Sequence, residues 1–397
     1  MHPGPFRQLL GATTLCSLGL VVTTSLAAQA PTIQVQGRIQ AQYRFSSGDS
    51  TANYSTTGVS NIFEIRRLRI QTNVRFGDNI TLVIQPSFEM ASLRMRDAFL
   101  RVGLTPTLGL VAGQEKSPFQ RYEMNSSNNL LSIERGLRVL RLSGKEALND
   151  ILVQNGYASQ DLGAFLDFDS RDHRLYAKAG VQQGSRESAT DVNNAKSFFG
   201  RATYVARKNK DDQPVLQLGA SFGSRDRAIC NAAANSGAGC TTNIAYFADS
   251  SKRTNAFGLD AEWGGFRPGL HVIADFATGD NARFRINSGR NTGNLRNSAD
   301  SNVVTFRGVH VVGAYRVMTT GSDTRLIKIL EPAVRLDYTD PNTDLDNDHG
   351  ILITPVLNIY FANTVVLRSG LDLYFYKTAT GESKSARELK FSWQANF

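Results

Sequence analysis

The feature that most constrains this chain is a run of alternating apolar and polar residues between residues 33 and 45. The odd-numbered positions are Ile33, Val35, Gly37, Ile39, Ala41, Tyr43 and Phe45, and the even-numbered ones are all glutamines or arginines. A period of two places successive side chains on opposite faces of a β-strand. The run is longer than the five or six residues, roughly, of an ordinary strand, and it suits the roughly 9–11 that a tilted strand needs to cross a bilayer.

The same alternation returns along the chain. It covers residues 67–76, continues after a Gly-Asp-Asn turn at 77–79 into 80–90, and reappears at 365–376. Short turns such as 105–107 separate some runs, whereas long polar stretches such as 279–302 separate others. This layout is typical of outer-membrane barrels, so we predict an all-β fold, an antiparallel transmembrane β-barrel. Proline removes a ladder hydrogen bond, so we expect bulges or strand starts at Pro86, Pro332 and Pro355.

Composition excludes several other classes of protein. Of the 397 residues, 41% are apolar and only 20% are charged, which does not fit a disordered chain. The mean hydropathy of −0.25, with a single long apolar run, excludes a polytopic helical membrane protein. The formal charge of +9 could suggest nucleic-acid binding, but the chain has no basic module of that kind, and the leader expected at residues 1–30 argues for export.

Residues 1–30 have the features of a secretory signal peptide. Arg7 is their only charged side chain, an apolar run extends from residue 9 to 22, and small residues lie near the end of the segment. We expect cleavage between residues 27 and 30, and a mature barrel of residues 31–397. A buried structural helix is the alternative, but the run lacks an amphipathic period.

The last residues predict a strand that closes the barrel. One face of this strand holds Leu389, Phe391, Trp393, Ala395 and Phe397. An open strand edge in lipid would leave backbone groups without hydrogen bonds, so the last strand must pair with the first. Phe397 also resembles the terminal signal by which the barrel assembly machinery recognises outer-membrane barrels. The alternative is an edge strand of an exported, soluble β-sandwich.

Two cysteines, Cys230 and Cys240, remain once the leader with Cys16 is removed. They flank a loop of small residues, and in an oxidising compartment we expect a disulfide between them, with two free thiols as the alternative. No cofactor and no metal site is expected. The four mature histidines are dispersed, and the acidic segment that begins at Asp344 lacks the glycine and glutamate spacing of a calcium loop.

Four segments carry a family resemblance. These are EIRRLR at 64–69, RDAF at 96–99, GQEKSPF at 113–119 and IERGL at 133–137. In order and spacing they resemble the phosphate-selective porin O and P family, most specifically over residues 62–140. The resemblance implies a 16-stranded barrel in the outer membrane, assembly as a homotrimer, and passage of small anions such as phosphate. It also implies that the loop after the fifth strand, from about Pro118 to Arg135, folds into the lumen as a constriction.

The charged residues of the first strands define the candidate pore. The oily face must meet lipid, because a basic residue at the bilayer midplane costs roughly 2–4 kcal/mol. Arginine donors in a wet pore attract anions and suit phosphate oxygens. We therefore expect four arginines in the lumen, and further cations at the next strand and on the constriction loop. In order, these residues are Arg38, Arg44, Arg67, Arg69, Arg101, Lys116, Arg121 and Arg135.

Two features complicate this prediction. Arg94 and Arg96 have even numbers and Arg101 has an odd one, so in a regular strand they would face opposite sides of the wall. One of these groups must therefore lie at a bulge or beyond the apolar band. The loop also contains Glu115, Glu123 and Glu134, and the alternative is that Glu134 and Arg135 anchor the loop to the wall by ion pairs.

The sequence therefore predicts a passive outer-membrane channel, without catalysis, that prefers small anions and lies among outer-membrane lipids. A general diffusion porin with weak selectivity is the alternative within transport. A barrel lipase is the alternative among enzymes, and it would require a serine beside one of the histidines on the lipid-facing surface.

Overall fold

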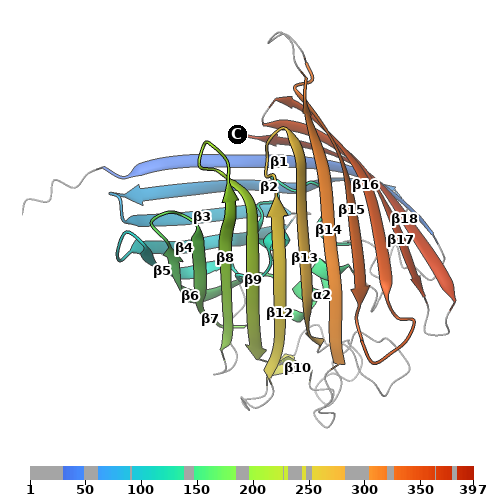
Figure 1. Ribbon diagram of the computed structural model, residues 1–397, viewed down its shortest axis with the longest axis horizontal. Coiled ribbons are helices and arrows are strands. Elements are labelled where there is room, and N and C mark those ends of the chain that lie inside the picture. Colours follow the sequence, from blue (N-terminus) through green and yellow to red (C-terminus); the bar gives the residue numbers. More distant parts are fainter. Residues whose placement is uncertain are drawn as a thin grey trace, which may run out of the picture. The chain divides into compact units, whose positions relative to one another are not determined.

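The computed structural model describes residues 30–48, 61–89, 92–137, 147–184, 196–226, 228–230, 244–246, 253–281, 304–319, 326–362, 364–377 and 382–397 (Figure 1). Residues Pro31–Phe397 form one compact unit. The leader predicted at 1–30 lies outside the described residues except for Ala30, so it stays a prediction.

Sixteen antiparallel strands form a closed barrel, as predicted. They are β1 (Thr32–Gly48), β2 (Asn61–Phe76), β3 (Ile80–Glu89), β4 (Ser92–Gly103), β5 (Leu108–Lys116), β6 (Gln160–Asp169), β7 (Leu175–Gln182), β8 (Ser197–Lys208), β9 (Pro214–Asp226), β12 (Arg253–Trp263), β13 (Gly269–Asn281), β14 (Val304–Met318), β15 (Ile329–Asp340), β16 (Gly350–Ala362), β17 (Val365–Lys377) and β18 (Ser383–Asn396). Each strand pairs with its sequence neighbours in the barrel, and β18 returns to β1. β10 (Ala228–Cys230) and β11 (Ile244–Tyr246) form a separate two-stranded antiparallel sheet.

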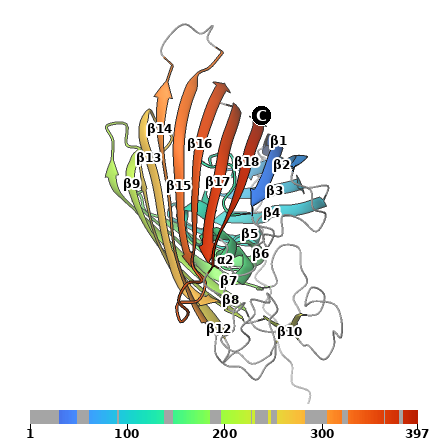
Figure 2. The ribbon, with the colours of Figure 1, turned by 90° about the vertical axis from the view of Figure 1, so that its right-hand side faces the viewer.

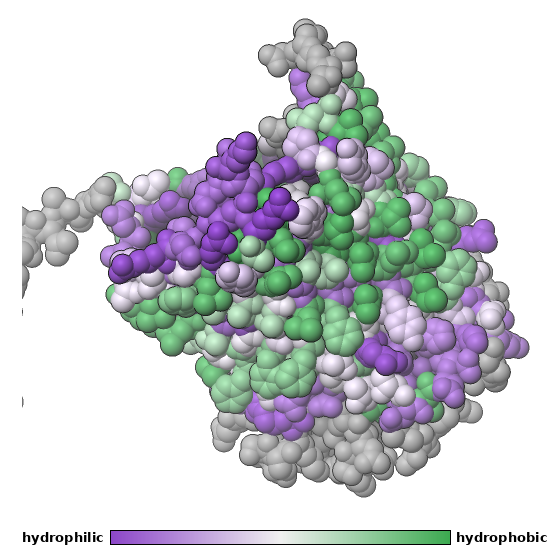
Figure 3. All heavy atoms as spheres, in the orientation of Figure 1, coloured by the Kyte–Doolittle hydropathy of each residue, from purple (hydrophilic) through white to green (hydrophobic). Residues whose placement is uncertain are grey.

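The two faces of the wall differ as the alternation predicts. Outward side chains are apolar and exposed, for example Ile33 (62%) and Phe63 (84%). The polar residues between them, such as Arg38 and Gln40, point inward and are buried. Figure 3 shows apolar residues gathered over the middle of the strands on the viewed face. The outer surface is therefore suited to hydrocarbon and the inner surface to water.

Prolines affect the wall in two ways. Pro86 lies at a register shift between β3 and β4, a bulge of the kind expected there. The same expectation is wrong for Pro332 and Pro355, which lie inside strands of continuous register. There the ladder is instead interrupted toward one neighbour, β14 or β17, because proline has no N–H to donate.

The closing seam involves the last residue of the chain. The Phe397 N–H donates to the Gly37 carbonyl at 3.0 Å, and the Gly37 N–H donates to the main-chain oxygen of Phe397 at 2.7 Å. These two bonds extend the pairing of β18 with β1, which runs from Asn396 opposite Arg38 to Ala386 opposite Gly48. The strand edge that lipid could not satisfy is thus paired.

Both helices lie in the long connection between β5 and β6, residues 117–159. They are α1 (Arg121–Met124) and α2 (Leu148–Asn155), and Figures 1 and 2 both show α2 surrounded by strands. Leu148, Ile151 and Leu152 form the buried face of α2, and Gly156 ends it in the left-handed conformation with φ of 76°. Among the described residues, no helix is long and apolar enough to cross a membrane.

An apolar cluster fixes this connection to the inner wall. Phe119, Tyr157 and the buried face of α2 pack with inward residues of several strands. The wall residues of the cluster are Val111, Phe165, Phe199, Ala256, Ala277 and Phe306. This connection is longer than the predicted segment from Pro118 to Arg135. The additional part contains α2, which makes a second contact with the wall.

Candidate functional site

A bulge in β2 creates the first anchor of the β5–β6 connection. Gln40 pairs with Arg67 and Ala41 with Ile65, so Arg66 is an extra residue, and Arg66 and Arg67 both turn inward. Glu134 accepts from both. Its carboxylate lies 2.5 and 3.0 Å from the Nε and Nη2 of Arg66, and 2.7 Å from the Nη2 of Arg67. The connection is thus tied to β2 by a buried, charge-assisted clamp.

A second anchor lies on β15–β17. Arg335 donates to the main-chain carbonyls of Glu134 and Arg135 at 2.8 and 2.5 Å. Asn358 donates to the Leu131 carbonyl at 3.0 Å. The segment around Glu134 is therefore held from two sides of the barrel interior.

A third anchor orients α1. The Asp275 carboxylate on β13 accepts from the main-chain N–H groups of Arg121 and Tyr122 at 3.0 and 3.3 Å. The Arg121 side chain forms an ion pair with Glu262 on β12. The start of α1 is therefore fixed to a third part of the wall.

Glu123 joins Lys116, at the end of β5, to Arg135 in the connection. It lies 3.6 Å from the Lys116 Nζ and 3.5 Å from the Arg135 Nε. Burial by itself would raise the pKa of Glu123, but these two cations outweigh burial and lower it. Glu123 therefore stays ionised and holds both cations in place.

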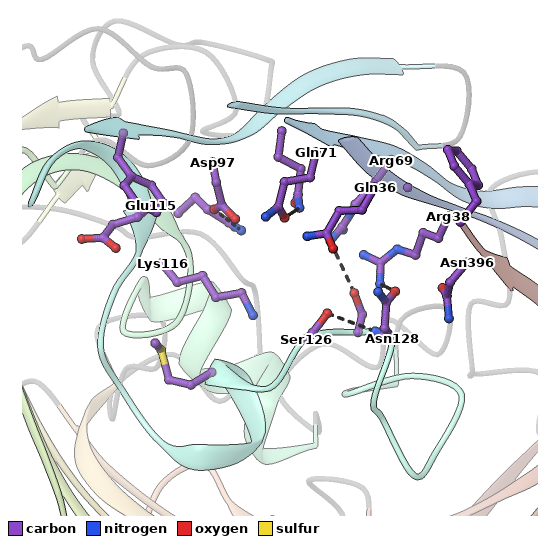
Figure 4. Close-up of a pocket in the computed structure, with 17 residues that line it drawn as sticks. Gln36, Arg38, Arg69, Gln71, Asp97, Glu115, Lys116, Ser126, Asn128 and Asn396 are labelled. Atoms are coloured by element: carbon purple, nitrogen blue, oxygen red, sulfur yellow. Dashed lines mark hydrogen bonds between the residues drawn. The ribbon is translucent and has the colours of Figure 1, made fainter. Parts of the chain in front are cut away.

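Between the connection and the β1–β5 wall lies a cavity of about 330 Å³. Figure 4 shows Arg38, Asn128 and Asn396 on one side of it, Asp97 and Glu115 on the other, and Lys116 reaching between them. Arg38 is 4% exposed and donates to the Oδ1 of Asn128 at the tip of the connection. The cavity is thus lined by charges of both signs and by amides.

Comparison with known proteins identifies the family. The sequence profile of the phosphate-selective porin O and P family matches residues 33–265, more than half of the chain. The chain belongs to this family. It is an outer-membrane porin, and its family and fold indicate a channel rather than an enzyme. A search of curated proteins found no match.

Solved structures share the fold of this porin at low identity. The outer membrane channel DcaP of Acinetobacter baumannii has a TM-score of 0.59 at 11% identity, covering 92% of this chain and 97% of its own. The anion-selective porin from Comamonas acidovorans has a TM-score of 0.57 at 10% identity, covering 92% and 100%. OmpT of Vibrio cholerae has a TM-score of 0.55 at 12% identity, covering 94% and 99%.

The eight cations expected in the porin lumen all lie on the inner side of the wall or on the β5–β6 connection, but seven of them have a carboxylate partner. The pairs are Arg44 with Glu64 and Glu388, Arg67 with Glu134, Arg69 with Glu89, Arg101 with Asp167, Lys116 with Glu123, Arg121 with Glu262, and Arg135 with Glu123. Arg38 is the exception within the part of the chain that the structure describes, since no carboxylate lies within 4.0 Å of it. Charge in this porin is therefore mostly compensated.

Sequence reasoning missed Arg66 and Arg335, whereas it expected a bulge at Arg96 or Arg101. Arg66 has the parity of a lipid-facing residue, and only the β2 bulge turns it inward. Arg96 lies at the β4 bulge, which resolves the conflict of parity with Arg101. Arg335 belongs to a strand too far away in sequence to be linked with the connection.

The two proposed roles of Glu134 and Arg135 separate in the structure. Glu134 anchors the connection to the wall, as the alternative interpretation held. The Arg135 side chain instead lies within the connection, where it donates to the carbonyls of Tyr122 and Asn125. Its main-chain carbonyl, rather than its charge, contacts the wall.

The remaining predicted features are the cysteine pair, the acidic segment and the histidines. Cys240 falls outside the described residues, as does the side chain of Cys230, so their disulfide stays a prediction. Asp344 is exposed, and the described part of the chain holds no cluster of His, Cys, Asp and Glu suited to a metal ion. His271 and His310 are buried beside Glu262 and Asp337 on the inner face, not on the lipid-facing surface that a barrel lipase would use.

Proposed function

We propose that this porin is an anion-preferring channel for small anions, among them phosphate. Arg38 carries the proposal, because it is a lumenal guanidinium that lacks a carboxylate partner and borders the cavity. An uncompensated guanidinium in a pore raises the local concentration of anions and binds oxyanions through its planar donors. The solved anion-selective porin from Comamonas acidovorans shares the fold.

Replacing Arg38 by glutamine tests this proposal. In planar bilayers, we expect the reversal potential in a KCl gradient to lose most of its bias toward chloride. We also expect phosphate to block the chloride current about tenfold less well, since a hydrogen bond to a charged group contributes about 1.5–3 kcal/mol. Arg387→Gln is the matched control, because Arg387 is exposed on the outer face of β18, whereas Arg38 points inward from β1. An unchanged reversal potential in Arg38→Gln would contradict the proposal.

A general diffusion pore is the second candidate. It is favoured by the ion pairs that compensate the other seven expected cations. The same recordings separate the two candidates, because a general pore passes chloride and potassium at similar rates and is not blocked by phosphate.

We infer that the β5–β6 connection narrows the channel. Its three anchors, at Glu134, Arg335 and Asp275, hold it across the inner wall. We also propose that residues 1–30 direct export and are cleaved, and that Phe397 is read by the assembly machinery. N-terminal sequencing of the mature porin tests the first of these, and the yield of folded barrel from Phe397→Ala tests the second.

We further propose that the porin assembles as a homotrimer through the outer face of β1, β2 and β18. An apolar groove of about 320 Å³ lies there, lined mainly by Ala41, Tyr43, Phe63, Ile65, Phe391 and Trp393. Aromatic anchors contribute about 2 kcal/mol or more each at interfaces. Native mass spectrometry should show that Phe63→Ser shifts trimers to monomers. Phe257→Ser, on the outer face of β12, should leave the trimers intact, and monomers in the unmutated porin would refute the assignment.

A further inference from the structure

We propose that the cavity beside the β5–β6 connection selects hydroxylated organic anions, such as sugar phosphates, over bare inorganic phosphate. This inference rests on the proposed anion channel and names its solute class. The two ends of the cavity differ in charge. Arg38 borders one side and Asp97 the other (Figure 4).

Asp97 is as uncompensated as Arg38. It lies next to the β4 bulge, and its Oδ1 accepts a hydrogen bond from the Gln160 amide at 3.5 Å. Within the described residues, no cation lies within 4.0 Å of its carboxylate. A solute that fills the cavity therefore meets a donor-only guanidinium at one end and an acceptor-only carboxylate at the other.

Amides and the Lys116 ammonium group line the space between these ends. Gln71 and Gln85 hydrogen-bond to each other at 2.5 Å, and both line the cavity. The Gln36 side chain also lines it and has no hydrogen bond to any described residue. An amide both donates and accepts, as a hydroxyl group does, and a sugar phosphate carries more hydroxyl groups than inorganic phosphate retains at neutral pH.

Bare phosphate matches only part of this lining. Its charge suits Arg38 and Lys116, but Asp97 repels it, and it has fewer hydroxyl groups to donate to the amide oxygens than a sugar phosphate has. A solute with a phosphate at one end and hydroxyl groups at the other pairs with both ends. The volume of about 330 Å³ also falls within the range of about 300–1,000 Å³ for sites that hold small organic ligands.

Block of the chloride current in planar bilayers tests the inference on the complete porin. The probes are glucose 6-phosphate, inorganic phosphate, glucose and glycine. We expect glucose 6-phosphate to half-block the current at a concentration about tenfold below that of inorganic phosphate, because hydroxyl donors gain hydrogen bonds to Asp97 and the amides. Glucose and glycine should block weakly.

Asp97→Asn provides the second measurement. The ratio of the two half-blocking concentrations should fall about tenfold, since the charged acceptor is lost for the hydroxyl groups and phosphate is no longer repelled. Asp172→Asn is the matched control, because Asp172 is exposed in the turn between β6 and β7 and should leave the ratio unchanged.

The outcomes separate this inference from the proposed function. Equal block by glucose 6-phosphate and inorganic phosphate would overturn the selection of hydroxylated anions and leave the anion channel standing. No block by either would overturn both. Stronger block by glycine would mean that Asp97 receives an ammonium group, which also overturns the inference.

Discussion

Glu134→Ala is expected to release the β5–β6 connection from the β2 wall and to give a larger, noisier single-channel conductance. The substitution leaves Arg66 and Arg67 buried without the carboxylate that both contact at 2.5–3.0 Å. Removing one partner of a buried ion pair costs about 3–5 kcal/mol. That cost corresponds to a shift of roughly a hundredfold or more between the anchored and released states of the segment.

The measurement is single-channel recording, with heat-modifiable gel mobility to show that the barrel itself is folded. Glu382→Ala is the control, since this glutamate contacts Lys384 at 3.4 Å in an exposed ion pair and should leave the conductance unchanged. An unaltered conductance in a folded Glu134→Ala barrel would mean that the anchors on β13 and β15–β17 suffice, and that the clamp on β2 is dispensable.

Gly37→Ala is expected to weaken the closing seam and to lower both the yield and the melting temperature of the folded barrel. A Cβ atom at residue 37 would lie 2.8 Å from the main-chain oxygen of Arg69 and against the ring of Phe397. The ring can move, but the oxygen belongs to the neighbouring strand. Overpacking of this kind costs about 1–3 kcal/mol, and here it acts where Phe397 joins Gly37.

Gly313→Ala on β14 is the matched control, because a Cβ there would meet nothing closer than the Val272 side chain at 3.9 Å. Melting can be followed by the loss of β-sheet circular dichroism in detergent. If both alanine variants melt at the same temperature as the unmutated porin, the close approach at the seam does not limit stability.

Much of the barrel could be predicted from local pattern. A strand between lipid and water must alternate, so the run from Ile33 to Phe45 indicates its own two faces before any partner is known. The same alternation predicts that the side chains of Arg38 and Arg69 point into the barrel. The strand count of 16 did not follow from the pattern itself, since it came from the family resemblance and was confirmed by the closed sheet.

The candidate site was only partly predictable. Strand parity is lost at each bulge, and the bulges at Arg66 and Arg96 depend on how two strands pair rather than on either strand alone. Ion pairs such as that of Arg69 with Glu89 likewise join neighbouring strands, so the charge that remains free in the lumen cannot be counted along the sequence.

The amino-acid order by itself determined that this chain forms a barrel with an oily exterior and a polar interior, because that choice depends only on how side chains alternate between lipid and water. Only the tertiary structure decided which cations are neutralised and which are open to solute. Arg335 reaches the carbonyls of Glu134 and Arg135 across some two hundred residues of sequence. Contacts of that range arise from closing the sheet and folding the β5–β6 connection inside it, and no local period encodes them.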